Sequence, residues 1–346
     1  MKAVVIHAPH DLRFDDWEAD AAAPGPMEVQ VRIGAGGICG SDLHYYHQGG
    51  FGVIRVQHPM VLGHEIAGTV SAVGAGVQHV TAGDRVAVSP SVPCGHCKYC
   101  QEGLQQHCLD MRFYGSAMRN PHVHGGFREQ LTCRADQAHR LPPGTELTEA
   151  AFAEPLAVCL HAARQAGPLQ GKRVLVSGCG PIGALSVMVA RHGGAREIVV
   201  TDLLDEPLAL ARQVGADEAI NMAATPEGLA RFGADKGTFD VVFEASGSAS
   251  AVAAAIGVAR PQATFVQLGI GGAETPLPLN LVVSKELSLR GTFRFHEEFA
   301  VAVDVIGRRR IDVRPLLSLV LPAAEAKKAF DVASDRKQAM KVQLAF

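Results

Sequence analysis

The chain has 346 residues, of which 47% are hydrophobic and 19% charged, and its formal net charge is −3. This composition argues against a disordered chain, and the lack of a basic excess argues against a protein that captures nucleic acid through the phosphate backbone. Because no stretch reaches the roughly 18 uninterrupted apolar residues of a membrane span, we expect a cytoplasmic protein of two domains with neither a nucleic-acid nor a membrane partner.

The first 150 or so residues alternate short strand-like segments with Gly- and Pro-rich breaks. Examples are EVQVRI at 28–33 and DRVAVS at 84–89. An apolar and polar alternation with period two is typical of half-buried strands. We therefore predict a barrel-like, mostly antiparallel β domain over residues 1–154, which residues 290–346 complete after an intervening domain.

A second feature of this region is a cluster of cysteines in C-x2-C-x2-C-x7-C spacing, formed by Cys94, Cys97, Cys100 and Cys108. Four thiolates at this spacing can close a tetrahedron around one zinc ion and leave no position for water, which marks a structural site. Two disulfides would conflict with a reducing compartment, and an iron–sulfur cluster would lack any accompanying redox motif. The cysteines outside the metal groups, Cys133, Cys159 and Cys179, are expected to be small core residues.

A more dispersed group of metal-binding side chains spans the same region. Cys39 lies in GGICGSDLH, His64 and Glu65 lie in VLGHEIAGTV, and Glu154 lies in AFAEPLAVCLH. A thiolate, an imidazole and carboxylates can supply the three protein ligands of a catalytic zinc ion, whose open position polarises a substrate oxygen. The sequence therefore indicates two Zn²⁺ ions per chain, one structural and one catalytic.

From about residue 155 the pattern changes to buried apolar runs that alternate with Ala-rich, helix-like stretches. KRVLVSG, REIVVTD, FDVVFEASG and ATFVQLGIGG are the runs. Continuous apolar strands between helices are typical of parallel βαβ units. We predict an α/β doubly wound parallel sheet, a Rossmann dinucleotide-binding domain, over residues 155–289.

The first strand-to-helix turn of this domain has G-x-G-x-x-G spacing, in the residues Gly178, Gly180, Pro181, Ile182 and Gly183. The first glycine allows a tight turn, the second lets the backbone approach a pyrophosphate, and the third permits close packing. The amides at the helix N-terminus favour the phosphate charge. This turn is therefore predicted to bind a nicotinamide dinucleotide.

Asp202 ends the next predicted strand, 19 residues past Gly183. Its carboxylate can accept hydrogen bonds from the adenosine ribose, although capping the following helix is an alternative role. The residues Leu203, Leu204 and Asp205 offer no cation for a ribose 2′-phosphate, which Asp202 would repel. NAD is therefore expected to be preferred over NADP.

The segments CGSDLH, GHEIAGTVSAVG, the four-cysteine lobe and GCGPIG follow in an order that resembles the zinc-containing medium-chain dehydrogenases over nearly the whole chain. AEPLAVCLHA resembles the sorbitol dehydrogenase branch, and MRFYGSAM and SLRGTFRF resemble its sugar-acid enzymes. The resemblance implies hydride transfer between C5 of L-idonate and NAD, giving 5-keto-D-gluconate, in a homotetramer or homodimer. A sorbitol or xylitol dehydrogenase, and a non-catalytic dinucleotide-binding relative, are the alternatives.

The same resemblance assigns roles to individual residues. It makes Cys39 and His64 zinc ligands. Of Glu65 and Glu154, one would bind the zinc directly and the other would hold a water molecule, and the resemblance leaves open which carboxylate has which role. It has Ser41 and His44 carry the substrate proton outward. The substrate contacts that it implies are Tyr45, Arg112, Phe113 and Arg294.

A sugar acid carries a carboxylate, so a fixed cation is expected beside it. Arg294 is the first candidate, followed by Arg112 and Arg119, with His122 and His124 as weaker donors. The alternative is that Arg119 and both histidines are solvated loop residues.

Overall fold

The computed structural model describes residues 1–18, 23–272 and 274–346, which form two compact units. The first comprises Met1–Glu154 and Phe299–Phe346, and the second comprises Pro155–Glu298. The chain passes between them within α4 (Ala153–Ala166) and at the start of α9 (Glu298–Gly307). Within the described residues, no helix combines the length and apolar character needed to cross a membrane.

Residues 290–298, which the sequence pattern assigned to the first domain, lie in the second unit. The physical reason is the strand β18 (Ser288–Gly291), which pairs with β17 (Ala259–Gln267) and so extends the sheet of that unit past residue 289.

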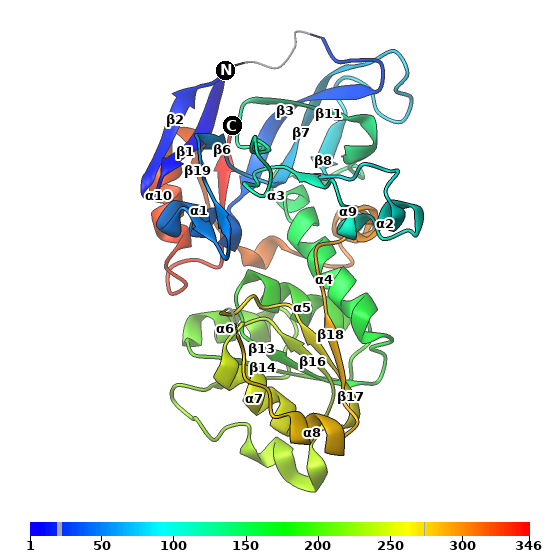
Figure 1. Cartoon of the computed structure of the whole chain (residues 1–346), viewed down its shortest axis with the longest axis vertical. Coiled ribbons are helices and arrows are strands. Elements are labelled where there is room, and N and C mark those ends of the chain that lie inside the picture. The colour runs from blue at the N-terminus through cyan, green and yellow to red at the C-terminus, as the bar shows by residue number, and fades with distance from the viewer. Residues whose placement is uncertain (19–22, 273) are drawn as a thin grey trace. The chain divides into compact units, whose positions relative to one another are not determined.

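The first unit is the mostly antiparallel β domain predicted from the sequence (Figure 1). Its largest sheet has seven strands in the order β12-β8-β7-β3-β20-β19, with β11 paired to β3, and a three-stranded sheet has the order β2-β1-β6. Of the pairs in these two sheets, only β19 with β20 is parallel. The elements are β1 (Lys2–Ala8), β2 (Asp11–Asp16), β3 (Glu28–Gly37), α1 (Gly40–Gln48), β4 (Gly50–Phe51), β5 (Ile54–Arg55), β6 (Met60–Val61), β7 (Glu65–Val73), β8 (Arg85–Val88), β9 (Ser91–Val92), α2 (Lys98–Gln101), β10 (Arg112–Phe113), β11 (Gln130–Arg134), β12 (Ala138–Arg140), α3 (Leu147–Ala150), β19 (Leu317–Pro322), α10 (Ala326–Ala333) and β20 (Lys341–Ala345).

One apolar core holds this unit together. Val29, Val31 and Ile33, alternate residues of β3, are buried with Val86 of β8 and Phe330 of α10. Alternate strand residues share one face, so the period-two pattern places all of them on the core side. The burial of these side chains stabilises the frame on which the first turn of α1 and the start of β7 are fixed.

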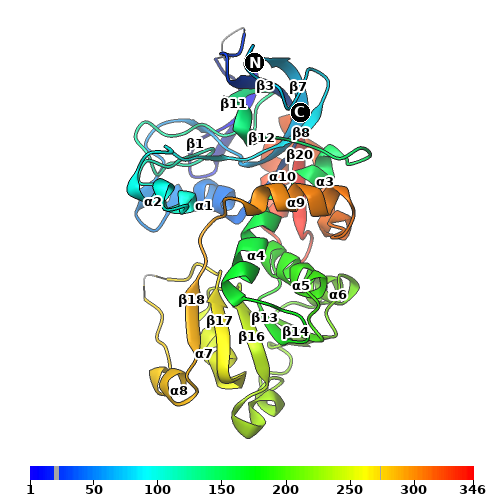
Figure 2. The ribbon, with the colours of Figure 1, turned by 90° about the vertical axis from the view of Figure 1, so that its right-hand side faces the viewer.

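The second unit is the predicted doubly wound domain. Its six strands have the order β15-β14-β13-β16-β17-β18, and every neighbouring pair is parallel. Figure 2 shows β18, β17, β16, β13 and β14 side by side, with β18 at the free edge. The remaining elements are β13 (Arg173–Ser177), α5 (Pro181–His192), β14 (Glu197–Asp202), α6 (Asp205–Gln213), β15 (Glu218–Asn221), β16 (Phe239–Glu244), α7 (Ala249–Val258) and α8 (Leu279–Ser284).

The strand order of this sheet reverses between β13 and β16. From β13 the chain adds β14 and β15 on one side, and from β16 it adds β17 and β18 on the other. In open parallel sheets, ligands bind outside the carboxyl ends of the strands at such a switch point. The glycine turn that follows β13 lies at this position.

Candidate functional site

The four-cysteine segment folds into a compact lobe around its sulfur atoms. The Sγ atoms of Cys94, Cys97, Cys100 and Cys108 all lie within 4.8 Å of one another. The N–H of Cys94 points at Cys108 Sγ at 3.2 Å, and the N–H of Asp110 points at the same sulfur at 3.3 Å. Each described cysteine is free of disulfide bonds. Four converging sulfurs with backbone donors aimed at them fit a closed tetrahedral zinc site.

The acidities of two thiols in this lobe differ strongly. The backbone N–H of Leu109 and that of Cys100 lower the pKa of Cys97 to about 6. Burial, together with the neighbouring sulfurs of Cys97 and Cys108, raises the pKa of Cys100 to about 12. Four sulfurs this close cannot all ionise cheaply unless a cation lies among them, so the lobe suits a divalent metal ion.

The second metal-binding group lies where the end of β3, the start of α1 and the start of β7 come together. Cys39 precedes α1, His64 precedes β7, and Glu65 is the first residue of β7. One ligand atom from each of Cys39, His64 and Glu65 lies within 4.8 Å of the others. His64 and Glu65 are buried, while Cys39 is partly exposed. The arrangement offers three converging ligands with one accessible side.

Asp42 ties this group together, a role that the sequence analysis missed. Its Oδ2 accepts the Cys39 N–H at 3.0 Å, and its Oδ1 lies 3.7 Å from His64 Nδ1. A carboxylate behind the non-ligating nitrogen fixes a metal-binding imidazole, which leaves Nε2 for the metal. Burial opposes a charged ring, but Asp42 and then Cys39 raise the pKa of His64 well above its ordinary value. The signal was present, because Asp42 belongs to the CGSDLH motif.

Glu154 and Lys341 complete the charges around the group. Glu154 lies in the first turn of α4, and burial raises its pKa to about 7 while His64 lowers it. Lys341 of β20 donates to Glu65 Oε1 at 2.6 Å. No motif links Lys341 to the other residues, since 276 positions separate it from Glu65, so sequence reasoning did not find it.

The residues of this group fit a zinc ion. His64 and Glu65 are both buried, and each offers a ligand atom within 4.8 Å of the sulfur of Cys39. A thiolate, an imidazole and a carboxylate are the donor types that zinc accepts. Glu65 lies with Cys39 and His64 in the group of mutually close ligand atoms, whereas Glu154 does not belong to it. The geometry therefore favours Glu65 as the third ligand.

The glycine turn after β13 has the features expected of a pyrophosphate cradle. Gly178 has φ of +88°, and a Cβ there would lie 2.8 Å from Ser246 Cβ. A Cβ on Gly183 would lie 1.9 Å from Gly178 O, so the fold itself requires these two glycines. A Cβ on Gly180 would meet no described atom within 4 Å. The space beside Gly180 is thus open at the N-terminus of α5, where an anion can approach the amides.

Asp202 ends β14 beside this turn, and it is buried. Its Oδ2 accepts the Cys179 N–H at 2.7 Å, and its Oδ1 accepts the N–H groups of Leu203 at 2.7 Å and Leu204 at 3.2 Å. Asp202 therefore organises the turn that precedes α6, but the N-cap of that helix is Leu204, whose side chain makes no cap hydrogen bond, so the capping role considered from sequence is not present.

The residues of the proposed proton path and their neighbours lie on α1. Ser41 and His44 are three residues apart on this helix and so share one side of it; His44 is exposed and Ser41 partly exposed. Tyr45 is buried, its hydroxyl oxygen accepts the Ala117 N–H at 3.0 Å, and its ring packs on Phe51. Phe113 lies close to the metal group, with its ring centre 5.6 Å from that of His64.

The cationic candidates for a substrate carboxylate separate into two classes. Arg119 donates to Leu109 O at 2.7 Å and Met111 O at 3.2 Å, so it holds the loop beside the four-cysteine lobe. Arg112 is exposed. Arg294 belongs to the second unit, is half-buried, and lies with its guanidinium 4.8 Å from the Phe293 ring centre.

The two histidines of the 111–127 loop make contacts within the fold: His122 is buried, contrary to the solvated alternative considered from sequence, and His124 is partly exposed. His122 is buried, accepts the Gln57 N–H at Nε2 and contacts Arg119 O at Nδ1, each at 2.9 Å. His124 packs edge-on against Trp17, and burial lowers its pKa. Both rings are therefore part of the loop's structure, which leaves Arg294 and Arg112 as the better candidates.

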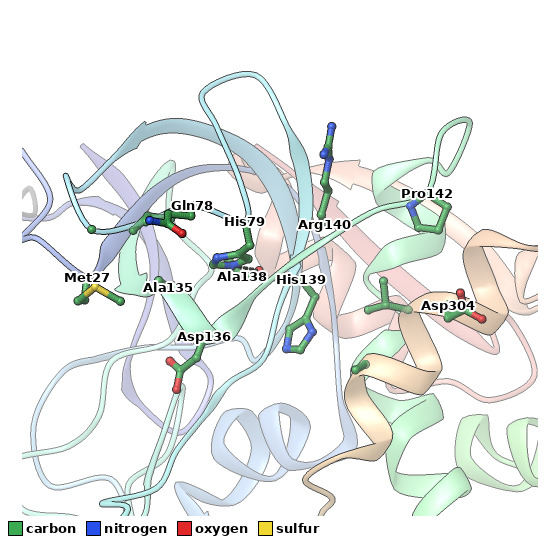
Figure 3. Close-up of a pocket in the computed structure, with 14 residues that line it drawn as sticks. Met27, Gln78, His79, Ala135, Asp136, Ala138, His139, Arg140, Pro142 and Asp304 are labelled. Carbon is green, nitrogen blue, oxygen red and sulfur yellow. Dashed lines mark hydrogen bonds between the residues drawn. The ribbon is translucent and has the colours of Figure 1, made fainter.

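A separate hollow of about 660 Å³ lies on the first unit between β12 and α9 (Figure 3). Its polar groups are largely paired with other parts of the protein: His79 contacts Ala138 O at 3.1 Å, and Arg140 forms an ion pair with Asp84 at 3.1 Å. Asp304 pairs with Arg308. No convergent set of polar groups marks this hollow as a site among the described residues.

Comparison with known proteins gives two family matches. Residues 25–143 match the alcohol dehydrogenase GroES-like domain, and residues 181–308 match the zinc-binding dehydrogenase domain. The chain is 46% identical over 316 residues to L-idonate 5-dehydrogenase (NAD(P)(+)) of Escherichia coli strain K12, with 91% of each chain covered. It is 35% identical over 334 residues to sorbitol dehydrogenase of Macaca fascicularis, covering 95% of this chain and 91% of that one.

The solved structures agree with these matches. The crystal structure of L-idonate 5-dehydrogenase from Escherichia coli superposes with a TM-score of 0.95 at 43% identity, over 100% of this chain and 98% of that one. A structure of galactitol-1-phosphate dehydrogenase from Escherichia coli gives a TM-score of 0.90 at 27% identity. The match to the first structure extends over both units.

Proposed function

This chain belongs to the zinc-binding alcohol dehydrogenase family, and we propose that it oxidises the C5 hydroxyl of L-idonate to 5-keto-D-gluconate with NAD as hydride acceptor. The observation that carries the proposal is the convergence of Cys39, His64 and Glu65 on one point. The identity of 46% to an L-idonate 5-dehydrogenase supports the choice of substrate.

Two alternatives are weighed against this proposal. A polyol dehydrogenase acting on sorbitol or xylitol would share every metal-binding and dinucleotide-binding residue, and the 35% identity to a sorbitol dehydrogenase supports it less strongly. A non-catalytic relative would have no chemical reason to keep three converging metal ligands with one accessible side, so the intact group speaks against it.

We assign two zinc ions per chain. The sulfurs of Cys94, Cys97, Cys100 and Cys108 would hold the structural ion. Cys39, His64 and Glu65 would hold the catalytic ion, with the carboxyl of Glu154 positioned to hold a water molecule beside it. A zinc ion bound there would supply Lewis-acid polarisation of the substrate oxygen and lower the pKa of the hydroxyl.

The chain's own residues would then move the proton and place the dinucleotide. Ser41 would accept the proton of the substrate hydroxyl, and His44, on the same side of α1 and exposed, would pass it to water. The open space beside Gly180 would receive the pyrophosphate, and the amides at the start of α5 would bind its oxygens. Phe113, beside His64, would shield one side of the reacting carbon from water.

Coenzyme preference gives a first test. We expect kcat/KM with NAD to exceed that with NADP by at least about tenfold, or about 1.4 kcal/mol, because Asp202 repels a 2′-phosphate. Asp202→Asn removes the charge but keeps one acceptor oxygen for the turn, so it should narrow the gap. Asp205→Asn, three residues further on, is the matched control and should leave the gap unchanged. Equal efficiencies with both coenzymes in the unmodified protein would refute the assignment.

That comparison is informative because the name of the Escherichia coli relative includes both coenzymes. If NADP proved equally effective, a cation from elsewhere would have to meet the 2′-phosphate. Arg212 of α6 is the candidate, and its guanidinium donates to Ala219 O at 2.7 Å.

Substrate charge gives a second test. Arg294→Ala is expected to raise KM for L-idonate by a factor equivalent to about 1.5 to 3 kcal/mol, the usual worth of a hydrogen bond to a charged group, and to leave KM for sorbitol nearly unchanged. Arg112→Ala is examined in parallel, and Arg119→Ala is the control, since Arg119 is engaged with two loop carbonyls. Initial rates over a panel of aldonates and polyols provide the measurement.

The polyol alternative would stand if sorbitol were the better substrate of the unmodified protein. It would also stand if neither the Arg294 nor the Arg112 variant distinguished charged from neutral substrates.

The free edge of the second unit's sheet supports the homo-oligomer expected from the family resemblance. All four residues of β18 are exposed, and Ile270, Leu279 and Val283 of the preceding segment are large exposed hydrophobics. An exposed edge strand with apolar neighbours is suited to pairing with a second copy of itself. Light scattering that found only monomers would exclude this proposal.

A further inference from the structure

Lys341 is a buried lysine at the start of β20. The residue is 3% exposed. Its Nζ donates to Ile38 O at 2.9 Å and to Glu65 Oε1 at 2.6 Å, and it also forms an ion pair with Glu65 Oε2. Burying an ammonium group costs several kcal/mol unless it is paired with an anion and hydrogen-bonded. The lysine is therefore held by a carboxylate of the metal-binding group itself.

The pair forms across an intervening strand. β3 lies between β7 and β20, with Gly37 opposite Glu65 on one side and opposite Gln343 on the other. Lys341 is two residues before Gln343, so its side chain lies on the same face of β20. A Cβ on Gly37 would lie 2.1 Å from Glu65 Oε2 and 3.1 Å from Lys341 Cε. The absence of a side chain at position 37 thus lets Lys341 and Glu65 meet over β3.

The charges around Lys341 are mainly negative. Glu65 contacts it directly, and Cys39 and Glu154 act on it through space. Of the other charged groups nearby, Asp42 faces His64 on the far side of the ligand group. Lys341 therefore supplies one fixed positive charge to a buried site rich in anionic ligands, at a point where a zinc ion would supply two.

We propose that Lys341 is the resident counter-charge of the catalytic metal site, which neutralises the buried carboxylate of Glu65 when the metal is absent and competes with zinc for it. The inference rests on the proposed zinc ligands Cys39, His64 and Glu65. It has two consequences. Lys341 stabilises the fold most when the metal is absent, and it weakens the affinity of the site for zinc, because two cations share one carboxylate.

The test replaces Lys341 by Met, which keeps the length of the side chain and removes its charge. In Lys341→Met, the Kd for zinc at the catalytic site should fall by at least about tenfold, since the competing charge is gone. The rise in Tm on adding zinc should exceed that of the unmodified protein by at least about 3 °C. Lys341→Arg, which keeps the charge, should stay close to the unmodified protein in both measurements.

Lys285 offers a matched control. It is also a buried lysine, but among the described residues its Nζ donates to backbone carbonyls, those of Ile256, Gly257 and Ala259. Lys285→Met should lower Tm equally with and without zinc and leave the zinc Kd unchanged. If Lys341→Met behaved like Lys285→Met, or if it bound zinc more weakly, the counter-charge role would be refuted.

Competition with a chelator removes zinc from the two sites in separate steps. The step that is missing in Cys39→Ser is the release of zinc from the catalytic site. If the unmodified protein lacks that step, the proposed zinc site fails. If the step is present but Lys341→Met does not lower the Kd for zinc at the catalytic site, only the present inference fails.

If the Lys341→Met variant does not fold without metal, Lys341→Gln is measured instead. A variant that folds only after zinc is added would be the strongest form of the expected result.

Discussion

Replacing Cys39 by serine is expected to lower kcat/KM by at least about a thousandfold, or about 4 kcal/mol of transition-state stabilisation. The substitution removes the only sulfur from the three proposed zinc ligands. A serine hydroxyl does not ionise at neutral pH and binds zinc weakly, so it cannot replace the thiolate. The same variant should retain the structural zinc, because Cys39 contributes nothing to the four-cysteine lobe. Initial rates with L-idonate and NAD, together with the zinc content per chain, provide the measurement.

Cys133→Ser is the matched control for this prediction. Cys133 is buried in β11, in the same unit, and lies outside both groups of metal-binding residues. Its replacement should cost some stability but leave turnover and zinc content near those of the unmodified protein. Near-normal activity of Cys39→Ser would contradict the assigned mechanism.

The second large effect is expected at the four-cysteine lobe. Cys97→Ser removes one of four converging sulfurs, so the zinc content should fall from about two ions per chain to about one. Because the binding free energy of a structural zinc ion is coupled to folding, Tm should fall by at least about 5 °C. Plasma emission spectrometry and thermal unfolding measure the two quantities.

Cys179→Ser is the control here, since Cys179 is buried in the second unit and takes part in neither metal group. A Cys97→Ser variant that kept two tightly bound zinc ions and an unchanged Tm would show that the lobe does not hold a structural metal.

The fold class could be predicted because its signals are local. Period-two alternation in β3 and β8, apolar runs in β13 and β16, and the glycine turn after β13 each arise from a short segment. The two metal-binding groups were also predictable, because cysteine and histidine at fixed spacings have few other uses. The cysteines assigned to the core, Cys133, Cys159 and Cys179, are buried as expected.

The remainder of the site depends on contacts between segments that are distant in sequence. The pairing of Lys341 with Glu65 follows from the order of β20, β3 and β7 in one sheet, which no motif reports. The structural roles of Arg119 and His122 likewise depend on loop carbonyls and amides that they reach only after folding. The cytoplasmic location and the roles of Ser41, His44 and Tyr45 stay predictions.

The choice of Glu65 rather than Glu154 as the third zinc ligand also required the structure. Both carboxylates are buried, and the sequence placed each beside a motif of the family. Only the mutual distances of the ligand atoms separate them, with Glu65 inside the group formed by Cys39 and His64. Glu65→Gln should therefore release zinc, whereas Glu154→Gln should keep it and lose rate.

The most direct test of the catalytic zinc is to remove it from the purified protein with a chelator that leaves the structural ion in place, and to add zinc back in measured amounts. The rate of NADH formation from L-idonate is followed at each addition. We expect almost no activity in the depleted protein and a linear return of activity that is complete at about one added zinc ion per chain. Full activity in the depleted protein, or no recovery on adding zinc, would contradict a catalytic role for the site at Cys39, His64 and Glu65.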